Sequence, residues 1–221
     1  MNGIIIIDKP LGRTSHDMVY VMRKMTGIKK VGHTGTLDPE ATGVLPVCIG
    51  SATKVADMLT LSDKCYRAEL VLGMTTDTQD ADGEVLTECE VTCSEDEIRQ
   101  VIMSFVGEIE QIPPMYSAIK QNGKKLYELA RKGIEVERKS RKVTINSIDI
   151  LEINGERVTI DVSCSKGTYI RTLCEDIGMK LHVGAYMNTL RRTKTGPFTI
   201  EESHTLKEIE TLKTTASLKK S

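Results

Sequence analysis

The stretch KVTINSIDILEINGERVTIDVSCS, residues 142–165, carries two runs rich in Val, Ile and Thr on either side of Asn154-Gly155. Both runs are typical of β-strands, because β-branched side chains pack well on a pleated, half-buried surface. An Asn-Gly pair between two such runs supplies the positive φ angles that a tight hairpin turn requires. The stretch therefore predicts an antiparallel β-hairpin.

Strand and helix patterns are mixed along the rest of the chain. Apolar or alternating runs predict strands at residues 3–10 and 64–73. Thr14 or Ser15 as the cap and Gly27 as the closing residue predict a helix through about residue 25, and the capping box of Ser94 and Glu97 predicts a helix at residues 94–107. The stretch SATKVADML, residues 51–59, also looks helical. Because strands and helices do not follow a clean βαβ alternation, we expect an α+β fold with a central mixed, mostly antiparallel β-sheet flanked by helices and loops.

The N-terminus and the cysteines limit the compartment and the cofactors. The N-terminal apolar run stops after four isoleucines at Asp8, which is too short for a signal peptide or a membrane span. We therefore expect a cytoplasmic protein with no membrane partner. Its six cysteines form no CxxC pair, and no histidine stands near Cys89 or Cys93 to complete a zinc site. The expected cysteine state is the reduced thiol, with no metal and no cofactor.

Charge is segregated along the chain although the net charge is only −1. Residues 76–98 contain nine acidic and no basic side chains, whereas residues 120–142 contain nine basic side chains and three glutamates, a net charge of 9 − 3 = +6. A surface divided in this way can hold a polyanion on one side. Two solvated faces without a partner would give the same pattern, and charge alone leaves both interpretations open.

A single carboxylate, Asp38, stands in HTGTLDPEATGVLP, residues 33–46. Pro39 pushes Asp38 towards extended backbone angles, and Gly35 and Gly43 permit turns that other residues resist. This framing suits a carboxylate that meets a substrate in one orientation. An Asp-Pro turn or a helix N-cap is the alternative interpretation.

Six blocks of the chain, taken in order, resemble the TruB family of bacterial tRNA pseudouridine-55 synthases. Together they cover roughly residues 3–200, and they read GIIIIDKPLGRTSHD, GHTGTLDPEATGVLP, KCYRAELVLGMTTDTQDADGEV, IEQIPPMYSAIKQNGKKLYELARKGIEVERKSRKV, SCSKGTYIRTLCEDIG and LRRTKTGPF. The resemblance implies the pseudouridine synthase fold and the isomerisation of the T-loop uridine-55 of tRNA, with the base flipped out of its stack. It implies the tRNA T-arm as partner, no guide RNA, no cofactor or metal, and a monomer.

The resemblance also implies roles for individual residues. Asp38 matches the catalytic aspartate, Arg171 matches the arginine that pairs with it, and Tyr66 matches the tyrosine that packs on the target base. The other substrate-binding positions that it implies are His33, Lys54, Asp80, Tyr169 and Leu190. Among them, it implies that Lys54 contacts phosphate and that Asp80 supports Arg171. Without the resemblance, ordinary packing or a solvated surface would account for each of these side chains.

The expected domain organisation follows from the same resemblance. We expect a catalytic domain at residues 1–202, with an inserted basic thumb at about residues 108–142, and a tail at residues 203–221. Family members usually continue into a small RNA-binding domain of the PUA type. Because this chain stops at Ser221, we expect that domain to be absent.

Two other functions remain as alternatives. One is a tRNA-binding or tRNA-folding protein of the same fold that carries out no chemistry, and the intact set of Asp38, Tyr66 and Arg171 speaks against it. The other is the guide-RNA-dependent relative of the family. The block IEQIPPMYSAIK and the basic thumb are instead similar to the stand-alone tRNA type.

Overall fold

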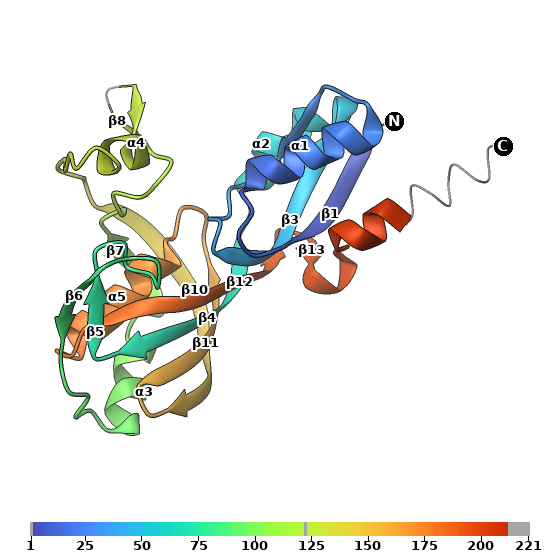
Figure 1. Cartoon of the computed structure of the whole chain (residues 1–221). Coiled ribbons are helices and arrows are strands. Elements are labelled where there is room, and N and C mark those ends of the chain that lie inside the picture. The colour runs from blue at the N-terminus through green and yellow to red at the C-terminus, as the bar shows by residue number, and fades with distance from the viewer. Residues whose placement is uncertain (1, 122, 212–221) are drawn as a thin grey trace. The chain divides into compact units, whose positions relative to one another are not determined.

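The computed structural model describes residues 2–121 and 123–211, and Figure 1 shows its α+β fold. The chain divides into two compact units: a first unit of residues 1–67 with 190–221, and a second unit of residues 68–189. Most strand pairs are antiparallel, and β12 with β3 is a parallel pair, so the expected mixed, mostly antiparallel sheet is confirmed.

The first unit is built on the strand order β1-β3-β12, with β2 paired to β3 and β13 paired to β12. Its strands are β1 (Gly3–Lys9), β2 (Val31–His33), β3 (Ala41–Ile49), β13 (Phe198–Thr199), the start of β4 (Lys64–Leu72) and the end of β12 (Ala185–Thr195). Its helices include α1 (Ser15–Thr26), the 3-10 helix η1 (Gly50–Val55), α2 (Ala56–Thr60) and the 3-10 helix η2 (Ile200–Glu202). The buried face of α1 packs on β1, β2 and β3 (Figure 1).

Helix α1 begins and ends where the sequence predicts. The Thr14 side chain accepts a hydrogen bond from the backbone of Asp17, and the Asp17 side chain accepts one from the backbone of Thr14, which completes a capping box. Gly27 closes the helix in the left-handed conformation, with φ of 71°. The expected strand at residues 3–10 is β1, and it ends one residue before Pro10.

The second unit contains the predicted hairpin within the strand order β4-β11-β10-β7. Its strands are β5 (Met74–Thr76), β6 (Val85–Glu88), β7 (Gly107–Gln111), β8 (Lys120–Gln121), β9 (Lys124–Lys125), β10 (Arg141–Asn154) and β11 (Arg157–Cys164). Asn154 pairs with Arg157, so the two turn residues are Gly155 and Glu156, one position later than the Asn-Gly pair. Gly155 takes the positive φ of 59° at the first turn position, as in a type II′ turn.

Among its described residues, the second unit has the helices α3 (Glu95–Met103), α4 (Leu126–Ala130) and α5 (Ile170–Lys180). Helix α3 has the predicted capping box of Ser94 and Glu97. Helix α5 is buried along most of its length, with Leu173 and Ile177 fully covered. No helix in the described part of the chain is long and apolar enough to cross a membrane.

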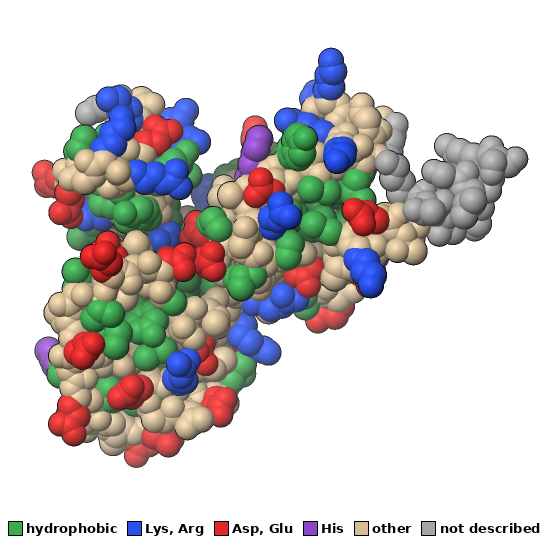
Figure 2. Space-filling view, in the orientation of Figure 1, with side chains coloured by type: hydrophobic (Ala, Val, Ile, Leu, Met, Phe, Trp, Pro, Cys, Tyr) green, Lys and Arg blue, Asp and Glu red, His purple; other side chains and the backbone are tan. Residues whose placement is uncertain are grey.

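The segment expected to be a thumb leaves the sheet between two neighbouring strands. Strands β7 and β10 pair antiparallel up to Gln111 and Arg141, and the chain between them holds β8, β9 and the short helix α4. Figure 2 shows Lys and Arg side chains gathered over this segment, and most of its basic residues are exposed. Asn122 within the thumb, and residues 212–221 of the expected tail, lie outside the described residues.

Candidate active site

The loop between β2 and β3 carries Asp38, and hydrogen bonds hold it on both sides of that residue. Before Asp38, the Ser15 hydroxyl accepts a hydrogen bond from the Leu37 amide at 2.8 Å and donates one to the Leu37 carbonyl at 3.1 Å. After it, the Pro39 carbonyl accepts from the Gly12 amide at 3.0 Å. Asp38 itself is exposed. The loop therefore presents an accessible carboxylate on a backbone anchored to the first unit.

A buried lysine supports the same loop from β1. Lys9 is fully covered, and its ammonium donates to the carbonyls of Arg13 at 2.5 Å, Pro10 at 2.9 Å and Pro39 at 3.1 Å. Burial lowers the pKa of Lys9 to about 8, and the negative charge of Glu40 partly counteracts this effect. Lys9 was not among the residues predicted from the sequence, although its place directly before a proline at the end of an apolar strand is a usable signal.

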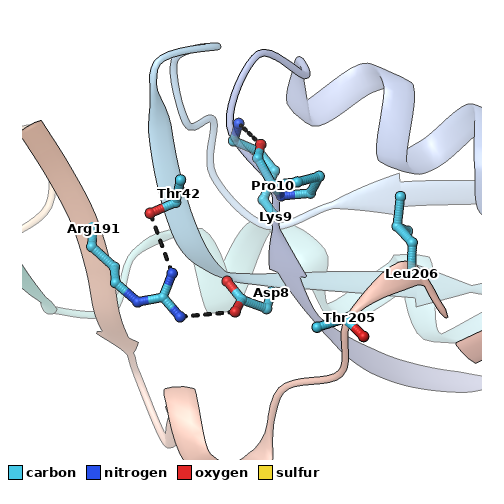
Figure 3. A pocket seen from close by; sticks show the side chains of 7 residues that line it. All are labelled: Asp8, Lys9, Pro10, Thr42, Arg191, Thr205 and Leu206. Carbon is cyan, nitrogen blue, oxygen red and sulfur yellow. Dashed lines mark hydrogen bonds and ion pairs between the residues drawn. The ribbon is translucent and has the colours of Figure 1, made fainter. Parts of the chain in front are cut away.

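A second buried cation, Arg192, lies on β12. Its Nε donates to the Val44 carbonyl at 2.8 Å, and Nη1 and Nη2 donate to the carbonyls of Thr36 and Gly35, both at 3.4 Å. Arg192 was not predicted from the sequence either. Nothing in LRRTKTGPF separates it from Arg191, which bonds Asp8 at 2.8 Å and borders a pocket of about 330 Å³ (Figure 3).

The other expected residues of the first unit lie in four different elements. His33 is half-buried in β2, and burial lowers its pKa, with the charge of Arg192 acting in the same direction. A neutral ring at pH 7 can stack on a base without carrying charge. Tyr66 is buried in β4, Leu190 is half-buried in β12, and Lys54 is exposed in η1.

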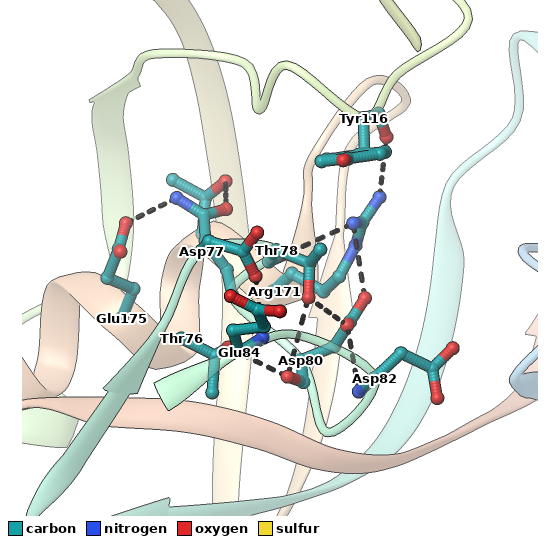
Figure 4. A network of polar contacts seen from close by, with 11 residues as sticks. Thr76, Asp77, Thr78, Asp80, Asp82, Glu84, Tyr116, Arg171 and Glu175 are labelled. Atoms are coloured by element: carbon teal, nitrogen blue, oxygen red, sulfur yellow. Dashed lines mark hydrogen bonds and ion pairs between the residues drawn. The ribbon is translucent and has the colours of Figure 1, made fainter. Parts of the chain in front are cut away.

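Arg171 and Asp80 meet in the second unit, at the N-terminal end of α5 (Figure 4). Arg171 Nη1 lies 3.2 Å from Asp80 Oδ2, and both side chains are well covered, with exposed fractions of 6% and 15%. The guanidinium also donates to the carbonyls of Thr78 at 3.2 Å and Tyr116 at 2.8 Å. A hydroxyl hydrogen bond from Thr78 to Asp80 Oδ1, at 2.5 Å, fixes the carboxylate in turn. The network holds Arg171 in one orientation.

Two glutamines that were not predicted from the sequence bind neighbouring segments to α5. Gln79, with a positive φ of 65°, accepts a hydrogen bond from Thr172 and donates one to Glu175. Buried Gln111 accepts from the Tyr169 amide at 3.0 Å and donates to the Tyr169 carbonyl at 3.2 Å. Tyr169 itself is half-buried at the N-cap of α5. A single Gln, whether in a loop as Gln79 or at the end of a strand as Gln111, gives no sequence pattern from which such a role could be predicted.

The expected site residues thus fall into two groups. Asp80 and Arg171 are in direct contact, as expected. Asp38 belongs to the first unit and Arg171 to the second, so the pairing of these two residues stays a prediction. Among the described residues, no group of three or more His, Cys, Asp or Glu side chains is placed to hold a metal ion.

Solved structures with a similar fold define the structural class of this chain. The chain resembles a solved chain from a Cbf5-Nop10-Gar1 complex, with 39% identity and a TM-score of 0.73, over 93% of this chain and 52% of that one. It also resembles a chain of an archaeal box H/ACA Nop10-Cbf5 complex, with 34% identity and a TM-score of 0.70. This chain therefore spans about half the length of those solved chains, and it shares their pseudouridine synthase fold.

Family models and curated relatives then give the family. The model of the TruB family pseudouridylate synthase N-terminal domain matches residues 23–170, and that of the tRNA pseudouridylate synthase B C-terminal domain matches residues 171–220. The chain is 59% identical to the tRNA pseudouridine synthase B of Alkaliphilus oremlandii, over 96% of this chain and 71% of that protein. It is 56% identical to the same enzyme of Clostridium perfringens strain SM101, over 95% and 72%. The chain belongs to the TruB family of pseudouridylate synthases.

Proposed function

We propose that this chain isomerises uridine-55 in the T-arm of tRNA to pseudouridine, with Asp38 as the catalytic carboxylate. The observation that carries the proposal is an exposed carboxylate on a loop anchored on both sides, in a chain of the TruB family. The reaction breaks the N1–C1′ bond of the nucleotide and joins C5 to C1′. Product and substrate are isomers, so atoms and electrons balance without a co-reactant.

The carboxylate acts close to the sugar and the base. It adds to C1′ or to C6 of the ring, or it removes a ribose proton, and the three routes share the need for an ionised Asp38 in a fixed position. Arg171 supplies the positive charge that keeps this carboxylate ionised, and Asp80 holds Arg171 in place for that task.

The remaining residues bind the extruded nucleotide and its RNA. Tyr66 packs on the target base, and Tyr169 and Leu190 contact the flipped nucleotide. The neutral ring of His33 stacks beside the site that the base leaves, and exposed Lys54 contacts phosphate. Extrusion costs a few kcal/mol of stacking, and these contacts offset it.

The thumb supplies much of the charge for this RNA contact. Its exposed lysines and arginines face an RNA arm that carries one phosphate per nucleotide, so binding by the thumb weakens as salt rises. We place the catalytic domain at residues 1–202 with the thumb at about 108–142, and we expect a cytoplasmic monomer that needs no guide RNA.

A tritium-release assay tests the function. The chain is incubated with a T-arm RNA hairpin that carries tritium at C5 of the target uridine, because formation of the new C5–C1′ bond expels that hydrogen. The wild type should release tritium and Asp38→Asn should not. Asp149→Asn, the same change at an exposed position of β10, is the matched control and should keep wild-type activity.

The outcomes separate the alternatives. Release by the wild type on the hairpin alone supports a stand-alone enzyme. No release with protein in excess over RNA, together with intact hairpin binding, would instead support a tRNA-binding protein without chemistry. Release that appears only with an added guide RNA would move the chain to the guide-dependent type.

A further inference from the structure

Arg192 is buried to an unusual degree for a charged residue. Its exposed fraction is 1%, and it is the largest by volume of the fully covered side chains among the described residues. Among the described residues, no carboxylate pairs with its guanidinium, and backbone carbonyls are its hydrogen-bond acceptors. A buried cation without a counter-charge carries a large desolvation cost, which an apolar side chain of similar volume would avoid. Filling space in the core therefore does not explain an arginine here.

The acceptors of Arg192 all belong to the segment that presents Asp38. Gly35 and Thr36 stand three and two residues before Asp38, and Val44 stands six residues after it. One planar guanidinium thus connects the backbone before Asp38, at Gly35 and Thr36, to the backbone after it, at Val44. The guanidinium spreads its N–H donors over three nitrogens in a fixed planar fork, so it can reach acceptors at two separated places, whereas the donors of a lysine all leave one nitrogen atom.

The backbone of Arg192 is held against the same segment. It pairs with Gly43 in the parallel register of β12 and β3, and the two strands are so close here that a Cβ on Gly43 would stand 2.2 Å from the Arg192 carbonyl oxygen. The guanidinium is therefore delivered from a rigid strand. Its neighbour Arg191, on the same strand, turns instead to Asp8 and Thr42 (Figure 3).

We propose that Arg192 is a positioning residue for Asp38, because its buried guanidinium fixes the backbone on both sides of the loop that presents the carboxylate. The inference rests on the proposed catalytic role of Asp38. Chemistry at a nucleotide that is already bound depends on the placement of the reacting carboxylate, and a misplacement of about 1 Å can cost on the order of 10²-fold in rate. Loss of Arg192 should therefore slow the chemical step while RNA affinity stays unchanged.

The first measurement is independent of activity. Amide hydrogen exchange of the loop is compared in wild type, Arg192→Lys and Arg192→Met, with Arg191→Lys and Arg191→Met as matched controls. The amides of Leu37 and Ala41, which are hydrogen-bonded in the wild type, should exchange about tenfold faster in both Arg192 variants. The Arg191 variants should leave the loop unchanged. Unaltered loop exchange in folded Arg192 variants would overturn the proposal.

The second measurement separates positioning from stability. Single-turnover tritium release at saturating enzyme, well below the unfolding midpoint, should fall about 10- to 100-fold in Arg192→Lys, with the Kd for the hairpin within about threefold of wild type. A folded Arg192→Lys with the wild-type rate would refute the proposal even if its loop exchanges faster. Absence of release in the wild type would instead refute the proposed function, and the exchange data would still decide whether Arg192 holds the loop.

If both Arg192 variants fail to fold, a substitution at Gly35, whose carbonyl accepts a hydrogen bond from Arg192, tests the same contact. Gly35→Ala disturbs the same contact, because φ of +96° at Gly35 is strained for any residue with a Cβ. Its loop should exchange faster and its single-turnover rate should fall as in Arg192→Lys. Gly27→Ala, also at positive φ and with open space around its Cβ, is the control. Wild-type rate and exchange in Gly35→Ala would overturn the inference.

Discussion

The close approach of β3 and β12 at Gly43 predicts a large loss of stability in Gly43→Ala. The new Cβ would lie 2.2 Å from the carbonyl oxygen of Arg192 and 2.9 Å from its carbonyl carbon and its amide nitrogen. All three are backbone atoms of a paired strand, so no side-chain rotation relieves the overlap. The two strands would have to separate at the register position that joins Gly43 to Arg192.

Two physical effects set the size of the loss. Gly43 has φ of +104°, which costs a residue with a Cβ about 1–2 kcal/mol. Forcing extra volume into a packed site costs about 1–3 kcal/mol more. The sum, roughly 2–5 kcal/mol, is a large part of the 5–15 kcal/mol that is typical of a folded domain.

Gly27→Ala isolates the second effect. Gly27 has φ of +71°, and a Cβ there would meet no atom within 4 Å, so this variant carries the backbone cost without the overlap. The free energy of unfolding from urea titration, followed by circular dichroism, should be lower in Gly43→Ala than in Gly27→Ala by about 1–3 kcal/mol. Equal losses in the two variants would refute the close approach of the strands as the reason for glycine at this position.

Three further predictions can be checked by the same unfolding measurement. Ser94→Ala removes the capping box of α3 and should cost about 1 kcal/mol, whereas Ser104→Ala, at the other end of that helix, should cost less. Gln111→Ala leaves the Tyr169 amide and carbonyl without their partner and should cost about 1–3 kcal/mol. Burial raises the pKa of Asp176 to about 6, above the unfolded value near 3.8, so the folded chain binds more protons between these values and its stability falls as pH rises through that window. Asp176→Asn should remove this fall, so the variant should be more stable than wild type by roughly 1–3 kcal/mol at pH 7 and equally stable near pH 4. Parallel curves of unfolding free energy against pH in the two proteins would contradict this prediction.

Much of the fold could be predicted because its signals are local. The capping boxes at Thr14 and Ser94, the closing Gly27 and the hairpin at Gly155 each depend on residues within a few positions of one another. The helix expected around Asp57 forms as η1 followed by α2, because no side chain caps either piece and the first turn winds as a 3-10 helix.

Less of the candidate site than of the fold could be predicted from local sequence signals. Gly35 and Gly43 both have the positive φ that their place around Asp38 suggested. The ion pair of Arg171 with Asp80 was expected from the family resemblance, and the structure contains it. No spacing rule predicts it, since the two residues are 91 positions apart.

The sequence by itself determined which elements form and which loop carries the lone carboxylate, because capping, turn chemistry and alternation act between near neighbours. Only the tertiary structure decided how that loop is held. Arg192 looks like an ordinary surface cation in the sequence, and its neighbour Arg191 looks the same. Arg192 lies on a strand paired with β3 and 148 residues after Val44, so its guanidinium meets the loop carbonyls only when the sheet has formed. Contacts of that kind arise from the register between distant strands, which the local sequence does not encode.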